Sequence, residues 1–154
     1  MIVEAQVTIN GSKAATWAAI TNIENASETI SGIEKIEVVE KPATGLVGLR
    51  WRETRMLFGK PATVEKRITD AAENEFYKTK TESDGFVYLC TKRISEGSGG
   101  ITLTETHESK PQGIIKKLMT IPMGFLIKGV WKKALLKDLN DIKEAVEREG
   151  TVAA

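Results

Sequence analysis

The sequence predicts an α+β fold in which a seven-stranded, curved antiparallel sheet wraps around a long C-terminal helix. Three observations predict this fold: a strand-like opening segment followed by helix-forming residues, an unbroken run of six strand-like segments, and a helical period after Pro111. A chain of 154 residues has the usual length of one domain. We therefore expect residues 1–154 to form a single domain.

The opening segment alternates apolar and polar residues over Val3–Ile9, which predicts a strand with one face in the interior. Asn10-Gly11 ends this strand. Ser12 can cap a helix, and the alanine-rich residues that follow it favour a helix through Ile20. A second short helix is expected from Asn22 through Glu28. The two short helices should lie across one end of the sheet.

The middle of the chain reads as strands and turns, with no helical period between them. The connecting stretches PATG, DAAEN, DG and EGSGG carry the residues that tight turns need. Connections this short can join only antiparallel neighbours, so the six strands should form a meander. The expected strands are Ile33–Lys41, Leu46–Phe58, Ala62–Ala71, Glu75–Ser83, Phe86–Ser95 and Ile101–Glu108.

The last forty residues change to a helical period. We expect a first segment over Gln112–Thr120, a break at Pro122 and a long helix over Met123–Glu149. Gly150 should end the long helix. An apolar stripe at spacings of three and four must pack on the sheet, and it consists of Leu135, Leu139, Ile142 and Val146.

The inward face of the predicted meander carries polar side chains. In WRETRMLFGK, residues 51–60, a period of two places Trp51, Glu53 and Arg55 on one face. Because an unpaired buried charge is costly, the charged groups of this face must pair, meet water or reach an open end. A hydrated cavity between sheet and helix would accommodate all three. The same parity adds Lys66, Tyr77, Tyr88, Cys90, Lys92, Glu105 and His107 to this face.

Any single charged residue of this face could also lie in a plain globular domain without a polar cavity. The ends of strands in a curved sheet often extend past the covering helix, so that their last inward positions face solvent. A β-bulge could also reverse the parity at Glu53, Lys66 or Glu105. Either feature would bring the charged group out to water.

Candidate catalytic residues are Glu53, Glu105 and His107, since an imidazole beside a carboxylate can transfer protons near pH 7. A lone histidine near a strand end is also typical of a surface or structural group. Cys90 has no base beside it in the sequence, which favours a buried packing thiol. No second histidine exists to build a His-rich metal site, no carboxylate spacing resembles a chelate, and GSGG joins two strands. We therefore expect no metal and no cofactor.

The composition limits the partner and the compartment. Lys and Arg total 22 against 21 Asp and Glu, so no net charge attracts a nucleic acid, and we expect none as a partner. One cysteine, with no signal-peptide pattern at the N-terminus, indicates the cytoplasm. The sequence is compatible with a monomer or a weak homodimer.

The most apolar stretch of the chain, LMTIPMGFLIKGVW, spans residues 118–131. Its methionine and aromatic side chains could form an adaptable lid over the cavity mouth. Packing in the core around a kink is the commoner arrangement, and an exposed stretch could bind an acyl chain, a membrane surface or a second copy of the protein. The lid residues would be Met119, Met123, Phe125 and Trp131.

Several stretches together resemble the START-like, or SRPBCC, superfamily, whose fold is that of the major birch-pollen allergen. INGSKAATWAAITNIENA is similar to its first strand and following helix, and GLRWRETRMLFGKPA to a motif of its polyketide cyclase/dehydrase-like branch. DGFVY, SGGITLTE and KALLKDLNDIKEAVE match the other landmarks. The resemblance implies a helix-grip fold and a ligand cavity between sheet and helix. The polar Glu105 and His107 stand where apolar residues are more usual.

Three functions follow from these observations and the resemblance. The first is a START-like ligand-binding domain that holds a small hydrophobic or amphipathic molecule, lipid-like or polyketide-like, without turning it over. Apolar side chains would contact its body, while Glu53 and Arg55 orient its polar end. The second is a cyclase or dehydratase that uses the acid–base candidates. The third is a module that makes transient membrane or partner contact through residues 118–131.

Overall fold

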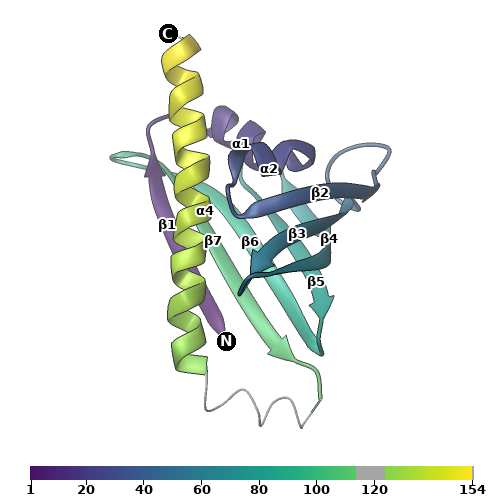
Figure 1. The fold of residues 1–154 in the computed structure, drawn as a ribbon. Coiled ribbons are helices and arrows are strands. Elements are labelled where there is room, and N and C mark those ends of the chain that lie inside the picture. Colours follow the sequence, from purple (N-terminus) through teal and green to yellow (C-terminus); the bar gives the residue numbers. More distant parts are fainter. Residues whose placement is uncertain (114–123, 154) are drawn as a thin grey trace.

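The computed structural model describes the backbone of residues 1–113 and 124–153 and the side chains of residues 1–113 and 127–150. Within these residues a seven-stranded antiparallel sheet curves around one long helix, as the sequence predicts (Figure 1). The helices are α1 (Lys13–Thr21), η1 (Ile23–Asn25), α2 (Ala26–Thr29) and α4 (Gly124–Ala153). The strands are β1 (Ile2–Ile9), β2 (Ile33–Glu40), β3 (Arg50–Leu57), β4 (Lys60–Ala72), β5 (Phe76–Ser83), β6 (Phe86–Gly97) and β7 (Gly100–Pro111).

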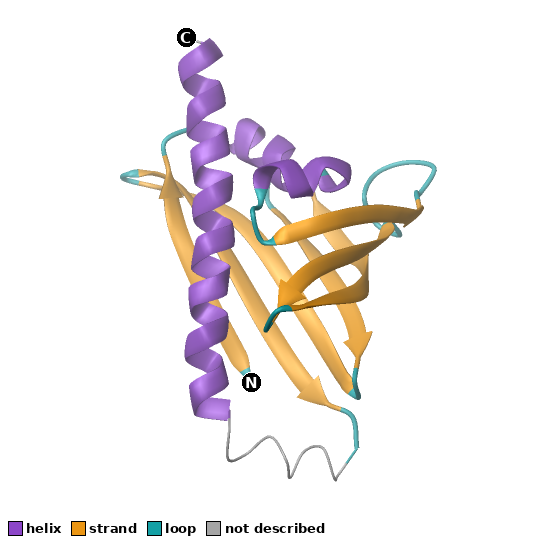
Figure 2. Ribbon diagram, in the orientation of Figure 1, coloured by secondary structure: helices purple, strands orange, loops and turns teal. Residues whose placement is uncertain are grey.

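The strands from β2 to β7 pair in sequence order, and β1 completes the sheet by pairing with β7, giving the order β1-β7-β6-β5-β4-β3-β2. The pairs Ile2↔Glu108 and Ile9↔Ile101 fix the register of β1. Figure 2 shows the strands as one continuous layer, with the short helices gathered at one end. The predicted meander is therefore confirmed.

The hairpin between β6 and β7 pairs as far as Gly97↔Gly100, so both strands are longer than predicted and EGSGG is confirmed as a turn. Gly100 has φ 126°, and a Cβ atom there would lie 2.7 Å from the carbonyl oxygen of Ile9. Only glycine fits a backbone that adopts this conformation against a neighbouring strand.

Other predicted boundaries are also wrong. β3 begins at Arg50 and not at Leu46, because Gly45 and Gly48 have positive φ and residues 46–49 form a turn. Helix α4 continues past Gly150, since that glycine lacks the positive φ that ends a helix. The second short helix is split into η1 and α2 and starts after Asn22, whose ψ of 65° is not helical. The expected segment Gln112–Thr120 lies almost wholly outside the described residues.

The apolar core joins α4 to the sheet beside β1, along which the long helix runs (Figure 1). The predicted stripe of α4 is buried, with Leu139 fully inaccessible to solvent. The predicted cap of α1 also forms, because the backbone N–H of Ala15 donates to Oγ of Ser12 at 3.0 Å. Of the helices that the structure describes, none is both long enough and apolar enough to cross a lipid bilayer.

Shortening Leu139 to alanine should lower the free energy of unfolding by about 2–5 kcal/mol, because the lost side chain leaves a cavity in the core. Urea denaturation followed by circular dichroism measures this change. Lys133→Ala, at an exposed position of the same helix, should change the free energy by no more than about 0.5 kcal/mol. Equal effects of the two substitutions would contradict the assignment of Leu139 to the core.

Candidate functional site

A cavity of about 580 Å³ lies between the sheet, the short helices and α4. Its volume falls within the range of about 300–1,000 Å³ that is typical of small-molecule sites. The helices contribute an apolar wall, while β3 to β7 contribute a largely polar floor. The apolar wall includes Ile20, Ile23, Ile30, Leu135 and Ile142.

The inward side chains lie where the period of two predicts them. The register between β3 and β4 and between β6 and β7 runs without a shift. No bulge therefore turns Glu53, Lys66 or Glu105 to the outer face of the sheet. Both carboxylates are buried and face the cavity. Among the predicted site residues, the cavity is lined by Trp51, Glu53, Arg55, Lys66, Tyr77, Tyr88, Cys90, Glu105, His107 and Trp131, with Lys92 beside them.

The other predicted lid residues cannot be placed against this cavity. Met119 and Met123 lie outside the described residues, as does the side chain of Phe125. Trp131, the remaining lid residue, is half-buried on α4, and its ring centroid lies 5.8 Å from that of Tyr88. These two rings form an aromatic part of the wall.

Glu53 accepts hydrogen bonds from three side chains on β3 and β4. Its Oε1 accepts hydrogen bonds from Nε of Arg55 at 2.7 Å and from Nζ of Lys66 at 3.0 Å. Its Oε2 accepts one from Nε1 of Trp51 at 3.4 Å. Burial alone would raise the pKa of Glu53, but the charges of Lys66 and Arg55 outweigh it and lower the pKa from 4.5 to about 2. Glu53 is therefore a carboxylate at neutral pH, which does not suit a general acid.

Arg55 also joins the floor to α4. Its Nη2 donates to Oδ2 of Asp138 at 2.8 Å, and its Nη1 donates to Oδ1 at 3.3 Å. A Cβ atom on Gly32 would lie only 3.0 Å from Nη1, so glycine leaves room for the guanidinium. Asp138 is a site residue that the sequence reasoning missed. Its position three residues after Leu135, on the buried stripe of α4, could have revealed it.

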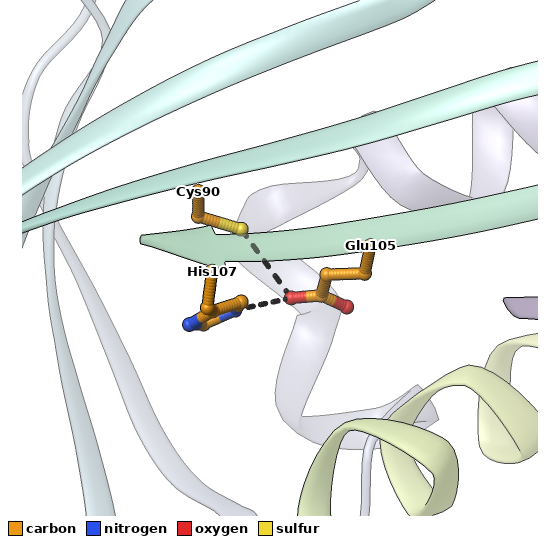
Figure 3. Close-up of side chains that lie close together, drawn as sticks. All are labelled: Cys90, Glu105 and His107. Carbon is orange, nitrogen blue, oxygen red and sulfur yellow. Dashed lines mark hydrogen bonds and ion pairs between the residues drawn. The ribbon is translucent and has the colours of Figure 1, made fainter. Parts of the chain in front are cut away.

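Glu105 gathers a second polar cluster. Its Oε1 accepts from Nε2 of His107 at 2.8 Å, Nζ of Lys92 at 3.0 Å and Sγ of Cys90 at 3.4 Å. Figure 3 shows Cys90 and His107 both directed at this carboxylate. Cys90 has no base beside it in the sequence, but in the folded chain the register pairs it directly with His107 across β6 and β7.

The pKa values in this cluster are shifted by the groups in contact. Burial would lower the pKa of His107, but Cys90 and Glu105 outweigh it and raise the pKa to about 9. Burial would raise the pKa of Glu105, but Lys92 and His107 hold it well below its usual range. Burial raises the pKa of Tyr77, whose hydroxyl group donates to the carbonyl oxygen of Ile20 at 3.2 Å. The ammonium of Lys92 lies 5.8 Å from the ring centroid of Tyr77.

Comparison with known proteins relates this architecture to one family. The family model described as "Polyketide cyclase / dehydrase and lipid transport" matches residues 1–147. The chain belongs to this family. The sequence matches no curated protein.

Several solved structures have a fold similar to that of this protein along nearly the whole chain. A START superfamily protein from Mycobacterium smegmatis has a TM-score of 0.77 at 15% identity and covers 96% of this chain and 97% of its own. The Zhui aromatase/cyclase from Streptomyces sp. R1128 has a TM-score of 0.74 at 17% identity, with 96% and 94% covered. Ara h 8.0201 has a TM-score of 0.73 at 18% identity, with 95% and 97% covered. The family match and these likenesses confirm the START-like superfamily and its helix-grip fold.

Acid should destabilise the protein partly through Glu53. Because its pKa is lowered on folding, the carboxylate contributes stability above pH 4.5 that is lost as the pH falls towards 2, a difference of about 3 kcal/mol. Urea denaturation between pH 7 and pH 2 should show a smaller loss of stability in Glu53→Gln than in the wild type. Glu34→Gln, at an exposed position on β2, should keep the wild-type dependence. Equal losses of stability in all three proteins would contradict the lowered pKa of Glu53.

The contact between Arg55 and Asp138 should show as energetic coupling between the sheet and α4. A double-mutant cycle with Arg55→Ala and Asp138→Ala should give a coupling energy of about 1.5–3 kcal/mol, because both groups are largely buried. The exposed pair Arg52–Glu37, at 3.9 Å, should give only about 0.2–1 kcal/mol in the same cycle. Coupling no larger than that of the exposed pair would argue against the bridge.

Proposed function

We propose that this protein binds a small hydrophobic or amphipathic molecule, lipid-like or polyketide-like, in the cavity between sheet and α4, without chemical turnover. The observation that carries this proposal is a cavity of about 580 Å³ with an apolar wall on the helices and charged groups on the floor. Such a division suits a ligand with one apolar and one polar end. Membership of a family described by polyketide cyclisation and lipid transport supports the same ligand class.

The body of the ligand would contact the aromatic and aliphatic wall. Trp51, Tyr77, Tyr88 and Trp131 all border the cavity, and burying apolar surface contributes about 25 cal/mol for each Å². Residues 1–154 would act as one ligand-binding domain. The protein would work in the cytoplasm, as a monomer or a weak homodimer.

The polar end of the ligand would meet Arg55 and Lys66. Arg55 has five N–H groups, of which three donate to Glu53 and Asp138, and Lys66 has three, of which one donates to Glu53. The remaining donors can bind an acceptor such as a carboxylate or carbonyl oxygen. Glu53 holds both cations in place, so it would orient the donors of the site.

A second candidate function is proton transfer within the same cavity. The contact of 2.8 Å between His107 and Glu105 favours it, because a carboxylate that orients an imidazole is a common acid–base arrangement. In that case the family's cyclase and dehydrase chemistry would occur at β7 and not at Glu53.

Transient membrane contact through residues 118–131 stays a prediction, since the side chains of residues 118–126 lie outside the described part of the chain. The structure exposes a different apolar group at the hairpin between β3 and β4, formed by Met56, Leu57 and Phe58. Leu57 also borders the cavity. This hairpin would place an apolar surface beside the cavity.

The anionic amphipathic dye 1-anilinonaphthalene-8-sulfonate tests ligand binding, because its sulfonate can meet Lys66 while its rings meet the apolar wall. We expect saturable fluorescence enhancement in the native protein and binding about 5–20-fold weaker in Lys66→Gln, which loses a charged hydrogen bond. Lys78→Gln, on the exposed face of β5, should bind the dye as the wild type does.

Two outcomes would count against the proposal. Absence of saturable binding to the folded protein would remove the cavity site, and equal affinity in Lys66→Gln would remove the role of the polar end. Native mass spectrometry of protein purified from its own source separates binding from turnover. A co-purified molecule whose mass is unchanged on incubation supports a carrier, whereas a product of altered mass supports the enzyme.

A further inference from the structure

Three side chains on β6 and β7 bring different metal-binding atoms together at one side of the cavity. Sγ of Cys90, Oε1 of Glu105 and Nε2 of His107 all lie within 4.8 Å of one another. The register explains the cluster, because Cys90 is the cross-strand partner of His107, and Glu105 follows two residues away on the same face of β7. Figure 3 shows the three side chains converging.

We propose that Cys90, Glu105 and His107 form a binding site for a divalent transition-metal ion of the zinc type. Zinc accepts sulfur, nitrogen and oxygen ligands at about 2.0–2.3 Å, which places tetrahedral ligand atoms about 3.3–3.7 Å apart. Oε1 of Glu105 lies 2.8 Å from Nε2 of His107 and 3.4 Å from Sγ of Cys90. Side-chain shifts of about 1 Å or less therefore suffice to make the spacing that zinc requires.

The carboxylate of Glu105 gives an independent reason to place a cation here. Its Oε2 is buried and has no hydrogen-bond partner among the described residues, while three donors crowd onto Oε1. A buried carboxylate oxygen without a partner is costly. A cation bound at Oε1 would offset part of the cost of burying this carboxylate.

Lys92 is the group that opposes a metal ion, because its ammonium lies 3.0 Å from Oε1 of Glu105. Metal binding removes the thiol proton of Cys90 and the Nε2 proton of His107, and the resulting thiolate adds a negative charge near the ammonium. The ammonium can then hold the carboxylate of Glu105 in place, as outer groups commonly do around metal ligands.

The arrangement has three protein ligands, all of which line the cavity. Zinc sites with three protein ligands leave a fourth position for water or a bound molecule. The site would thus present a metal ion to a molecule in the cavity. This proposal departs from the expectation, based on linear spacing, that no metal binds, and metal binding can be measured whether or not the proposed function holds.

Cobalt titration of tag-free, metal-stripped protein tests the site, because thiolate ligation to Co²⁺ gives an intense near-ultraviolet charge-transfer band. Cys90 is the sole cysteine and His107 the sole histidine, so the band can arise only from Cys90. We expect one equivalent of Co²⁺ to produce the band and one equivalent of Zn²⁺ to remove it. Calorimetry with Zn²⁺ should give the same stoichiometry.

Cys90→Ser should abolish the band, and Glu105→Gln and His107→Gln should each weaken Zn²⁺ binding by about 10-fold or more. Glu82→Gln, an exposed carboxylate on β5, should bind Zn²⁺ as the wild type does. Circular dichroism checks that each variant is folded. If a variant does not fold, the titration of the wild type alone tests the proposal. Absence of the band at one equivalent of Co²⁺ would overturn it, and so would an equal Zn²⁺ affinity in folded Cys90→Ser.

Discussion

The ion pair between Arg55 and Asp138 is the constraint on which the site depends. It joins β3, the strand next to the β2 edge of the sheet, to α4 through two hydrogen bonds of 2.8 and 3.3 Å. Because Arg55 also donates to Glu53, the same guanidinium neutralises both a carboxylate of the floor and one of the helix. Charged groups can be kept at low solvent exposure only when they are paired in this way. The bridge therefore lets the sheet and the helix stand apart around a polar floor instead of meeting in a dry core.

The core and the cavity divide the inner face of the sheet between them. Beside β1, the aliphatic side chains of α4 meet Ile9 and Leu103, and the space is filled. Along β3 to β7, the floor carries charged and hydroxyl groups, α4 reaches it through Asp138 and Trp131, and a cavity of about 580 Å³ lies there. One long helix thus serves two purposes, since its stripe of Leu139, Ile142 and Val146 fixes the fold while Asp138 reaches the site.

The sequence predicted the fold and the face of each strand because both depend on local periods. A period of two was enough to place Glu53 and Glu105 inside, and tight turns were enough to order the meander. It could not predict contacts that depend on register or on distant elements. Cys90 and His107 lie 17 positions apart in the sequence and become neighbours only when β6 and β7 pair. Asp138 becomes the partner of Arg55 only when α4 packs on the sheet. Boundaries failed where backbone conformation decided them, as at Gly48 and Gly150.

Glu53 and Glu105 are equally buried carboxylates on the same floor, yet their surroundings suit different roles. Both oxygens of Glu53 accept hydrogen bonds, and one of its two cations, Arg55, also donates to Asp138 on α4, so a change at Glu53 disturbs the bridge that supports the cavity. Glu105 directs one oxygen at three donors and leaves the other without a partner among the described residues. Its neighbours include a thiol and an imidazole, which are chemically versatile groups. The two charge clusters therefore lie on different strands of one floor, Glu53 on β3 and Glu105 on β7, and only the cluster around Glu53 is joined to α4 by the bridge.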